Sequence, residues 1–376
     1  MTEVKPPASP QPSWFARAGL LVYVLLIVYA SWYPFSGWHN NGLSPLAYLS
    51  APFPYYWTMF DVVTNVIGYM PFGLLMVFAL YPLLRRLPAV ILAVVAGALL
   101  SGVMEAIQTY LPTRVPSKLD LMTNLAGTLF GAVSGVLLSH AFLEESHFLE
   151  TRRRWFTHQT SGGGLIVLAL WPLAQIYPQG YLFGHGQLTP ILSEWLSAWL
   201  SRPIDLAAFL RHNVELTVEQ YWLSEAIITA CGLSGALLTL LCISRRHAPN
   251  ARLVIALILV TIAAKSLATA LLFAPENAFV WLTPGAQGGL LFGIAILSGL
   301  VFAPPVVQRR LAVLMLGISL FVVNAVPDNP YFVATLQTWV QGKFLNFNGA
   351  AQFLSLLWPF IAFWFLLHPV HRRNEK

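Results

Sequence analysis

Acidic and amide side chains recur at a fixed spacing inside two apolar stretches of the N-terminal third of the chain. Asp61 and Asn65 lie in the first stretch and Asp120 and Asn124 in the second, and both stretches read Ser/Thr-x-x-Asp-x-x-Thr-Asn-x-x-Gly. An aspartate at the centre of a bilayer costs about 2.5–3.5 kcal/mol on insertion scales. Because the same costly pair occurs twice, the pattern predicts a purpose for it, either structural or functional.

Further polar residues lie between the two copies. Glu105 and Gln108 are three positions apart, and Arg114 and Ser117 follow them. Residues three or four positions apart share one face of a helix. A carboxyl buried near other carboxyls could act as a general acid or base, whereas an arginine suits a phosphate or pyrophosphate. We therefore expect a polar binding pocket formed by Asp61, Asn65, Glu105, Gln108, Arg114, Ser117, Asp120 and Asn124.

The elements that must position these residues are membrane-spanning helices. Hydrophobic residues form 57% of the chain and charged residues 10%, and the mean hydropathy is +0.66. Apolar runs of about 20 residues can cross a ~30 Å hydrocarbon core as helices. The sequence predicts an all-α, polytopic integral membrane bundle of ten helices, at about 15–33, 59–81, 88–111, 119–141, 162–178, 221–243, 252–274, 285–304, 309–327 and 350–368.

The distribution of positive charge predicts that both termini are cytoplasmic. Of the 21 Lys and Arg residues, 15 then fall in inside segments and five in outside segments, and Lys265 lies within a span. Cytoplasmic loops of membrane proteins carry such an excess. This orientation places the polar pocket near the extracytoplasmic ends of its helices. The positive charges of the inside segments also account for the net charge of +6. Since no basic stretch is interleaved with aromatic residues, the sequence does not indicate nucleic-acid binding.

The chain is expected to contain two membrane domains. Residues 1–12 are rich in proline and predicted to be a disordered tail. Residues 13–143 form a four-helix domain with both copies of the repeat, 144–163 form a cytoplasmic linker, and 164–376 form a six-helix domain whose type the sequence does not identify.

Two features of the second domain each have two interpretations. Apolar residues at helical spacing over 191–200 predict either a helix on the outer membrane surface or one that covers the ends of the bundle. Glu225 and Lys265 are interpreted either as a pair between neighbouring helices or as an ion or substrate site, as in transporters.

Structural roles are the alternative for much of the pocket. Thr58 with Asp61, and Ser117 with Asp120, fit capping boxes at helix starts. Asn65, like Asn124, suits hydrogen bonds between helices.

Other residues of the first domain also suit packing. The glycines at positions 68, 73, 127 and 131 are expected to let helices approach closely, and Pro71 to kink its helix. Glu105 is too far from a helix end to be a cap, so we expect it to pair with Arg114, either as pure structure or as part of a functional site.

The order of these residues resembles that of a known family. Glu105-x-x-Gln108, Arg114 and Ser117-x-x-Asp120-x-x-x-Asn124-x-x-Gly127-x-x-x-Gly131, preceded by Asp61-x-x-x-Asn65-x-x-Gly68-Tyr-x-Pro71-Phe-Gly73, are similar to the VanZ-like family over about residues 15–140. The family comprises small bacterial membrane proteins and is named for a factor that gives low-level resistance to the glycopeptide teicoplanin. The resemblance implies a place in the bacterial cytoplasmic membrane and a role in the cell envelope. The family often has Lys and His after the first aspartate, where this chain has Val62 and Val63.

Three functions suit this pattern. The first is a non-catalytic envelope factor whose outward pocket binds a lipid-linked cell-wall precursor or another lipid headgroup, or shields it from a glycopeptide, and so changes teicoplanin susceptibility. The second is a membrane enzyme that modifies such a lipid through Glu105 or Asp120, and the third is a transporter. We predict the first, because the sequence contains no metal-ligand spacing, no serine nucleophile motif and no sign of a cofactor. The repeat also covers a helix pair of one orientation, whereas many transporters have inverted repeats.

Overall fold

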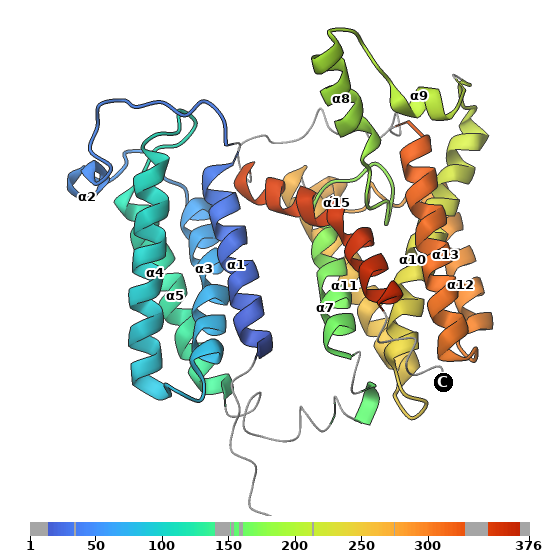
Figure 1. The fold of residues 1–376 in the computed structure, drawn as a ribbon, viewed down its shortest axis with the longest axis horizontal. Coiled ribbons are helices and arrows are strands. Elements are labelled where there is room, and N and C mark those ends of the chain that lie inside the picture. The colour runs from blue at the N-terminus through green and yellow to red at the C-terminus, as the bar shows by residue number, and fades with distance from the viewer. Residues whose placement is uncertain are drawn as a thin grey trace, which may run out of the picture. The chain divides into compact units, whose positions relative to one another are not determined.

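The structure is a computed structural model that describes residues 14–33, 35–139, 151, 154–157, 161–212, 214–273, 275–327 and 345–368. The regular elements in these ranges are helices (Figure 1), which confirms the all-α class. The chain divides into two compact units, Met1–Thr151 and Arg152–Lys376, called unit 1 and unit 2. The expected tail at 1–12 and most of the expected linker at 144–163 lie outside the described residues.

The helices follow the apolar runs of the sequence. Those of unit 1 are α1 (Trp14–Trp32), α2 (Ala47–Ser50), α3 (Met59–Leu80), α4 (Arg86–Gln108) and α5 (Lys118–Ser139). Those of unit 2 are α7 (Ser161–Ala174), α8 (Thr189–Leu200), α9 (Leu206–Leu210), α10 (Val218–Ile243), α11 (Asn250–Leu272), η2 (Pro275–Asn277), α12 (Pro284–Leu300), α13 (Pro305–Ala325) and α15 (Leu345–Leu367).

Every one of the ten predicted spans coincides with a helix. Six helices in the described ranges are long and apolar enough to cross a membrane: Asp61–Leu80, Arg86–Gln108, Lys118–Ser139, Val218–Ile243, Asn250–Leu272 and Pro305–Ala325. Four shorter apolar helices coincide with the other predicted spans: Ala16–Trp32, Gly162–Ala174, Pro284–Leu300 and Ala351–Leu367. The chain is thus a multi-pass helical membrane protein, while the count of ten spans and the orientation stay predictions.

Glycines let α3 and α5 of unit 1 touch along their backbones. A Cβ atom on Gly131 would lie 1.9 Å from the carbonyl oxygen of Met70, and one on Gly127 or Gly73 would lie 2.2 or 2.1 Å from a carbonyl oxygen of the facing helix. These three glycines confirm the expected close packing. Gly68 does not, because a Cβ there would meet nothing within 4 Å. Small residues are the usual means by which membrane helices approach closely.

Helix α1 packs against α3 and α4 and completes the core of unit 1. Ile27 of α1 lies in one buried cluster with Tyr69, Phe72 and Met104. The Tyr23 hydroxyl donates to the Gly68 carbonyl at 2.7 Å. Helix α3 continues through Pro71, and the expected kink there stays a prediction.

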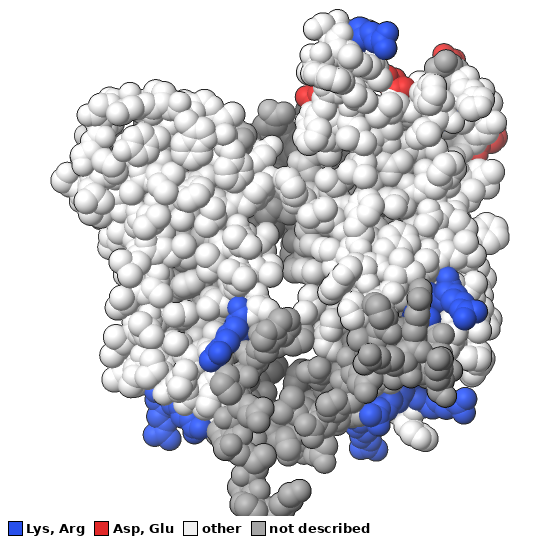
Figure 2. All heavy atoms as spheres, viewed as in Figure 1, with Lys and Arg blue, Asp and Glu red and all other residues white. Residues whose placement is uncertain are grey.

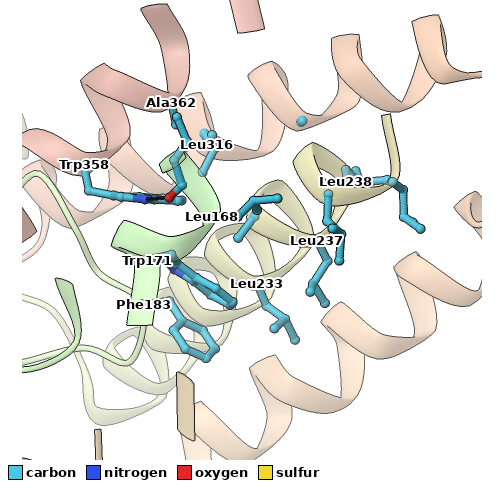
Figure 3. Packing of buried hydrophobic residues seen from close by; sticks show 14 of the residues in the cluster. Leu168, Trp171, Phe183, Leu233, Leu237, Leu238, Leu316, Trp358 and Ala362 are labelled. Atoms are coloured by element: carbon cyan, nitrogen blue, oxygen red, sulfur yellow. Dashed lines mark hydrogen bonds between the residues drawn. The ribbon is translucent and has the colours of Figure 1, made fainter. Parts of the chain in front are cut away.

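Helix α10 is the centre of unit 2. It has 26 residues, and 83% of its apolar stretch is buried. Figure 3 shows Leu233 of α10 near the aromatic rings of Trp171 and Phe183, and Leu237 and Trp358 belong to the same buried cluster. The ring centroids of Trp171 and Phe183 are 5.0 Å apart. The core of unit 2 is therefore built around a helix that is covered by protein.

The two ends of α10 differ in charge. Arg245 and Arg246 follow its C-terminal end, whereas Glu215 and Glu219 lie at its N-terminal end. Figure 2 shows most of the visible basic side chains of unit 2 toward one end and the acidic ones at the other. This asymmetry is of the kind that the positive-inside rule describes.

The amphipathic pattern at 191–200 forms helix α8, as expected. Its Trp195 and Trp199 are 67% and 80% exposed, and Leu192 and Leu200 are exposed as well. These four side chains therefore do not cover the ends of the bundle in unit 2. A position on the outer membrane surface stays the prediction for this helix.

Candidate functional site

The first copy of the repeat begins helix α3 with a complete capping box. The Thr58 hydroxyl accepts from the Asp61 backbone N–H at 3.2 Å, and Asp61 Oδ2 accepts from the Thr58 N–H at 3.0 Å. The same oxygen also accepts from the Thr58 hydroxyl at 2.7 Å. Asp61 is exposed, so it serves the start of its helix, and the structure does not bring it into the buried cluster.

The second copy uses its aspartate differently. Asp120 Oδ1 accepts from Asn65 Nδ2 of α3 at 2.9 Å. The Ser117 hydroxyl caps the start of α5, because it accepts from the Leu119 N–H at 3.1 Å. The Ser117 N–H donates to Glu105 Oε2 at 2.8 Å, so the second predicted capping box keeps its hydroxyl cap but lacks the reciprocal bond from Ser117 to Asp120. The close approach of α3 and α5 lets Asp120 bond across to Asn65 instead.

Asn124 and Gln108 also join elements of unit 1. Asn124 Nδ2 donates to the Ser101 hydroxyl at 3.0 Å, which confirms the expected bond between helices. Its Oδ1 is buried and has no hydrogen-bond partner among the described residues. Gln108 Nε2 donates to the Ser31 carbonyl oxygen at 2.9 Å and ties α4 to the end of α1.

Arg114 lies in the short loop between α4 and α5. Its Nη2 donates to the Tyr33 carbonyl oxygen at 2.8 Å, and its buried Nε has no partner in the described part of the chain. Burial lowers the pKa of the guanidinium below its ordinary value, and the nearby Glu105 carboxyl opposes that shift. Since an arginine stays protonated in proteins, the loop holds a fixed positive charge.

The expected ion pair between Glu105 and Arg114 does not form among the residues that the structure describes. Glu105 accepts from the backbone of Ser117, and Arg114 donates to the backbone of Tyr33. Both side chains are thus held by the main chain near the ends of α4 and α1. The sequence pattern cannot indicate a backbone partner of this kind. Every residue type has a backbone carbonyl and every type except proline has a backbone N–H, so the residue type at a position does not mark it.

Two side chains of the cluster were missed by sequence reasoning. Ser101 lies four positions before Glu105, on the same face of α4. Its spacing could therefore have indicated it. Thr123 receives a second bond from Asn65 Nδ2, at 3.3 Å, and is the threonine of the second copy of the repeat, equivalent to Thr64 in the first. Of the eight predicted residues, the structure bonds Asn65 to Asp120 and Glu105 to Ser117, while Gln108, Arg114 and Asn124 bond to other groups of unit 1.

The matched family covers this cluster. Residues 20–139 match the family model VanZ/LLP1. The VanZ/LLP1 segment runs from α1 to the end of α5 and contains all eight predicted site residues, in agreement with the partial resemblance read from the sequence. No curated protein and no solved structure matches the chain. The VanZ/LLP1 match lies within unit 1.

The predicted pair of Glu225 and Lys265 in unit 2 is wrong among the described residues. Glu225 Oε1 accepts from the Thr283 hydroxyl at 2.6 Å. Thr283 also caps the start of α12, where it accepts from the Ala286 N–H. The positive end of the α12 dipole therefore lies beside the buried Glu225 carboxyl. Lys265 is left without an ion-pair partner in the described ranges.

Proposed function

We propose that unit 1 is a non-catalytic factor of the bacterial cell envelope that binds the phosphate-bearing headgroup of a membrane lipid. The ligand class is a lipid-linked cell-wall precursor. The binding cluster is formed by Glu105, Arg114, Ser117, Asp120 and Asn124, at the extracytoplasmic ends of the helices in the predicted orientation. A bound headgroup there would be less available to a glycopeptide such as teicoplanin.

Arg114 is the observation that carries this proposal. Its guanidinium is half-buried and held by Tyr33 through one nitrogen, and its Nε has no partner within the described residues. A partly buried cation without a carboxylate partner is stabilised by a bound anion, and arginine binds phosphate oxygens through parallel hydrogen bonds. A phosphate at Nε would complete the arrangement.

The neighbouring polar groups suit the sugar or peptide part of such a headgroup. Glu105 and Asp120 each use one carboxyl oxygen in the bonds described above, which leaves the other oxygen for a hydroxyl group. Asn124 Oδ1 offers a further buried acceptor. We infer binding without catalysis because both carboxyls already hold the cluster together, and a general acid or base must be able to exchange its proton with the ligand.

The test compares Arg114→Ala with Arg17→Ala. Arg17 is a matched control, since its Nε donates to the Ala79 carbonyl in unit 1 at 3.3 Å but lies at the opposite helix ends. The full chain in lipid nanodiscs would be titrated with a polyprenyl diphosphate. Loss of a charged hydrogen bond of about 1.5–3 kcal/mol predicts that Arg114→Ala weakens binding by roughly 10- to 150-fold. Arg17→Ala should stay within about twofold of the wild type.

Equal affinities of the two variants would contradict the site, and no binding by the wild type would contradict the ligand class. Cells that express each variant would then be tested for teicoplanin susceptibility, with membrane levels of the protein quantified. Protection by the wild type and by Arg17→Ala, but not by Arg114→Ala, is the expected result.

A further inference from the structure

The connection between α1 and α3 of unit 1 is uncharged and exposes large apolar side chains. Residues 33–58 contain no Asp, Glu, Lys or Arg. Tyr55 and Tyr56 are 92% and 97% exposed. Five more large side chains of this connection are also exposed: Leu43, Leu46, Leu49, Phe53 and Trp57. We call residues 43–57, which include α2, the apolar loop. Exposed apolar residues grouped in this way mark a site of interaction with a membrane or a protein.

The level of the apolar loop follows from its contact with α4. The Tyr48 hydroxyl of α2 donates to the Gly102 carbonyl oxygen at 3.3 Å. Figure 1 shows α2 beside the last turns of α4. Gly102 is six residues before Gln108, the last residue of α4, or about 9 Å along the helix axis. The loop therefore folds back along the side of α4 and does not stand above its end.

The face of α4 that carries Gly102 shows which medium surrounds the loop. Leu99 lies three positions before Gly102, on the same face of the helix. Leu99 and the adjacent Val103 are 66% and 49% exposed. Helix α4 is long and apolar enough to cross a membrane, and exposed apolar side chains of such a span face lipid. The contact with Gly102 thus places the apolar loop against lipid, at the edge of the bilayer.

Turns inside the apolar loop satisfy part of its backbone. The Ala47 N–H donates to the Ser44 carbonyl oxygen at 2.9 Å, and the Ala51 N–H donates to the Ala47 carbonyl oxygen at 3.1 Å. The Leu49 N–H donates to the Leu46 carbonyl oxygen at 3.1 Å. An unsatisfied backbone group costs several kcal/mol in hydrocarbon, so these internal bonds lower the cost of placing the loop next to lipid.

A lysine adjoins the apolar loop. Lys118 Nζ, at the start of α5, lies 4.4 Å from the centroid of the Phe53 ring, within the range of a cation–π contact. Lysines near the ends of membrane helices extend toward the interface, where the lipid phosphates lie. Tyrosine and tryptophan are enriched at the same level. The residue types of the loop and its neighbour are therefore those of the membrane interface.

We propose that the apolar loop is an interfacial anchor that binds the phospholipid surface. Its leucine and aromatic side chains occupy the boundary between headgroups and acyl chains, and Lys118 binds lipid phosphate. Interfacial segments bury their apolar face about 5–10 Å into this boundary, a range that includes the level of Gly102. The anchor is a different surface from the polar cluster of unit 1, and it does not depend on the headgroup binding proposed for that cluster.

Fluorescence quenching of the full chain in phospholipid nanodiscs tests this proposal. The two cysteines, Cys231 and Cys242, are free thiols and would both be replaced by alanine. One new cysteine would then carry a small fluorophore. Tyr56→Cys probes the apolar loop, and Leu46→Cys is a second probe of the same loop if the first variant fails to fold. The quenchers are aqueous iodide and two phospholipids, with a nitroxide either near the headgroup or near the end of the acyl chain.

Two positions of unit 1 serve as matched controls. Thr113→Cys lies in the loop between α4 and α5, where the side chain is exposed, and its label should lose most fluorescence to iodide. Leu99→Cys lies nine residues before the end of α4, about 13.5 Å along the axis. Its label should lose most fluorescence to the nitroxide near the chain end.

The label of the Tyr56→Cys variant should lose most fluorescence to the nitroxide near the headgroup, and less to iodide than the label of Thr113→Cys loses. Leu46→Cys should give the same order. Iodide quenching equal to that of Thr113→Cys would place the apolar loop in water and overturn the proposal. Protection from all three quenchers would overturn it as well, because the loop would then be covered by protein, either unit 2 or a second copy of the chain.

Discussion

Gly131→Ala is predicted to separate α3 from α5. The added Cβ atom would lie 1.9 Å from the Met70 carbonyl oxygen and 2.7 Å from its carbonyl carbon, whereas real Cβ atoms keep at least 3.0 Å from such neighbours. The facing backbone must therefore retreat by about 3.0 − 1.9 = 1.1 Å along this contact. No rotamer change can relieve the clash, because the atoms that are met belong to the main chain of α3.

The free-energy cost of Gly131→Ala comes from the dispersion contacts and the hydrogen bond between α3 and α5. A gap of 0.5–1 Å forfeits about a quarter to a half of each dispersion contact across it, and overpacking costs typically about 1–3 kcal/mol. The retreat also stretches the bond between Asn65 and Asp120, now 2.9 Å, and a bond between membrane helices contributes about 0.6–2 kcal/mol. We expect Gly131→Ala to destabilise the pairing of α3 and α5 by about 2–4 kcal/mol in total.

Gly68→Ala is the matched control for this prediction. It makes the same chemical change in α3, where a Cβ atom meets nothing within 4 Å, and should alter stability by less than about 0.5 kcal/mol. Hydrogen exchange of α3 and α5 in the full chain measures the opening free energy of this pair without assuming that both units unfold together. Equal exchange in the two variants would refute the reasoning, since the backbone contact could then not be the constraint.

Two further predictions address single elements. Thr58→Ala removes the N-cap of α3 and should cost about 1 kcal/mol; Asp61→Ala should cost a similar amount, and the double variant should cost less than the sum, as measured by exchange at the start of α3. Asn324→Ala leaves the N–H groups of Leu188 and Thr189, at the start of α8, without their acceptor and should cost about 2–4 kcal/mol. Faster proteolysis within 175–188 would show this loss, and wild-type resistance would contradict the anchoring role of Asn324.

The positions of the helices could be predicted from the sequence because each apolar run must satisfy its own backbone in lipid. The run at 59–81 became α3, Met59–Leu80, with an error of one residue. The run at 162–178 failed at its end, because α7 stops at Ala174 and the chain turns inward. Apolar composition does not distinguish these outcomes, since a segment buried in protein is as apolar as one in lipid.

The candidate site shows where sequence reasoning ends. The two copies of the repeat are nearly identical, yet Asp61 caps its own helix and Asp120 bonds to Asn65 of another. Which of the two occurs depends on whether a facing helix is within reach, and that is a property of packing. Similarly, Glu105 and Arg114 are opposite charges at a suitable spacing, but each is held by a backbone group.

The burial of α10 has a consequence for the biogenesis of the protein. This helix is synthesised before α11, α12, α13 and α15, so it enters the bilayer while only α7 and the segment after it, among the elements that cover it, already exist. During that interval its hydroxyl groups need local acceptors, and Thr239 has one in the Gly235 carbonyl of the same helix, at 2.7 Å. Ser234, in contrast, donates to the Gly293 carbonyl of α12, at 3.4 Å, an acceptor that arrives later. We therefore expect α12 and α13 to pack against α10 only after it has entered the bilayer.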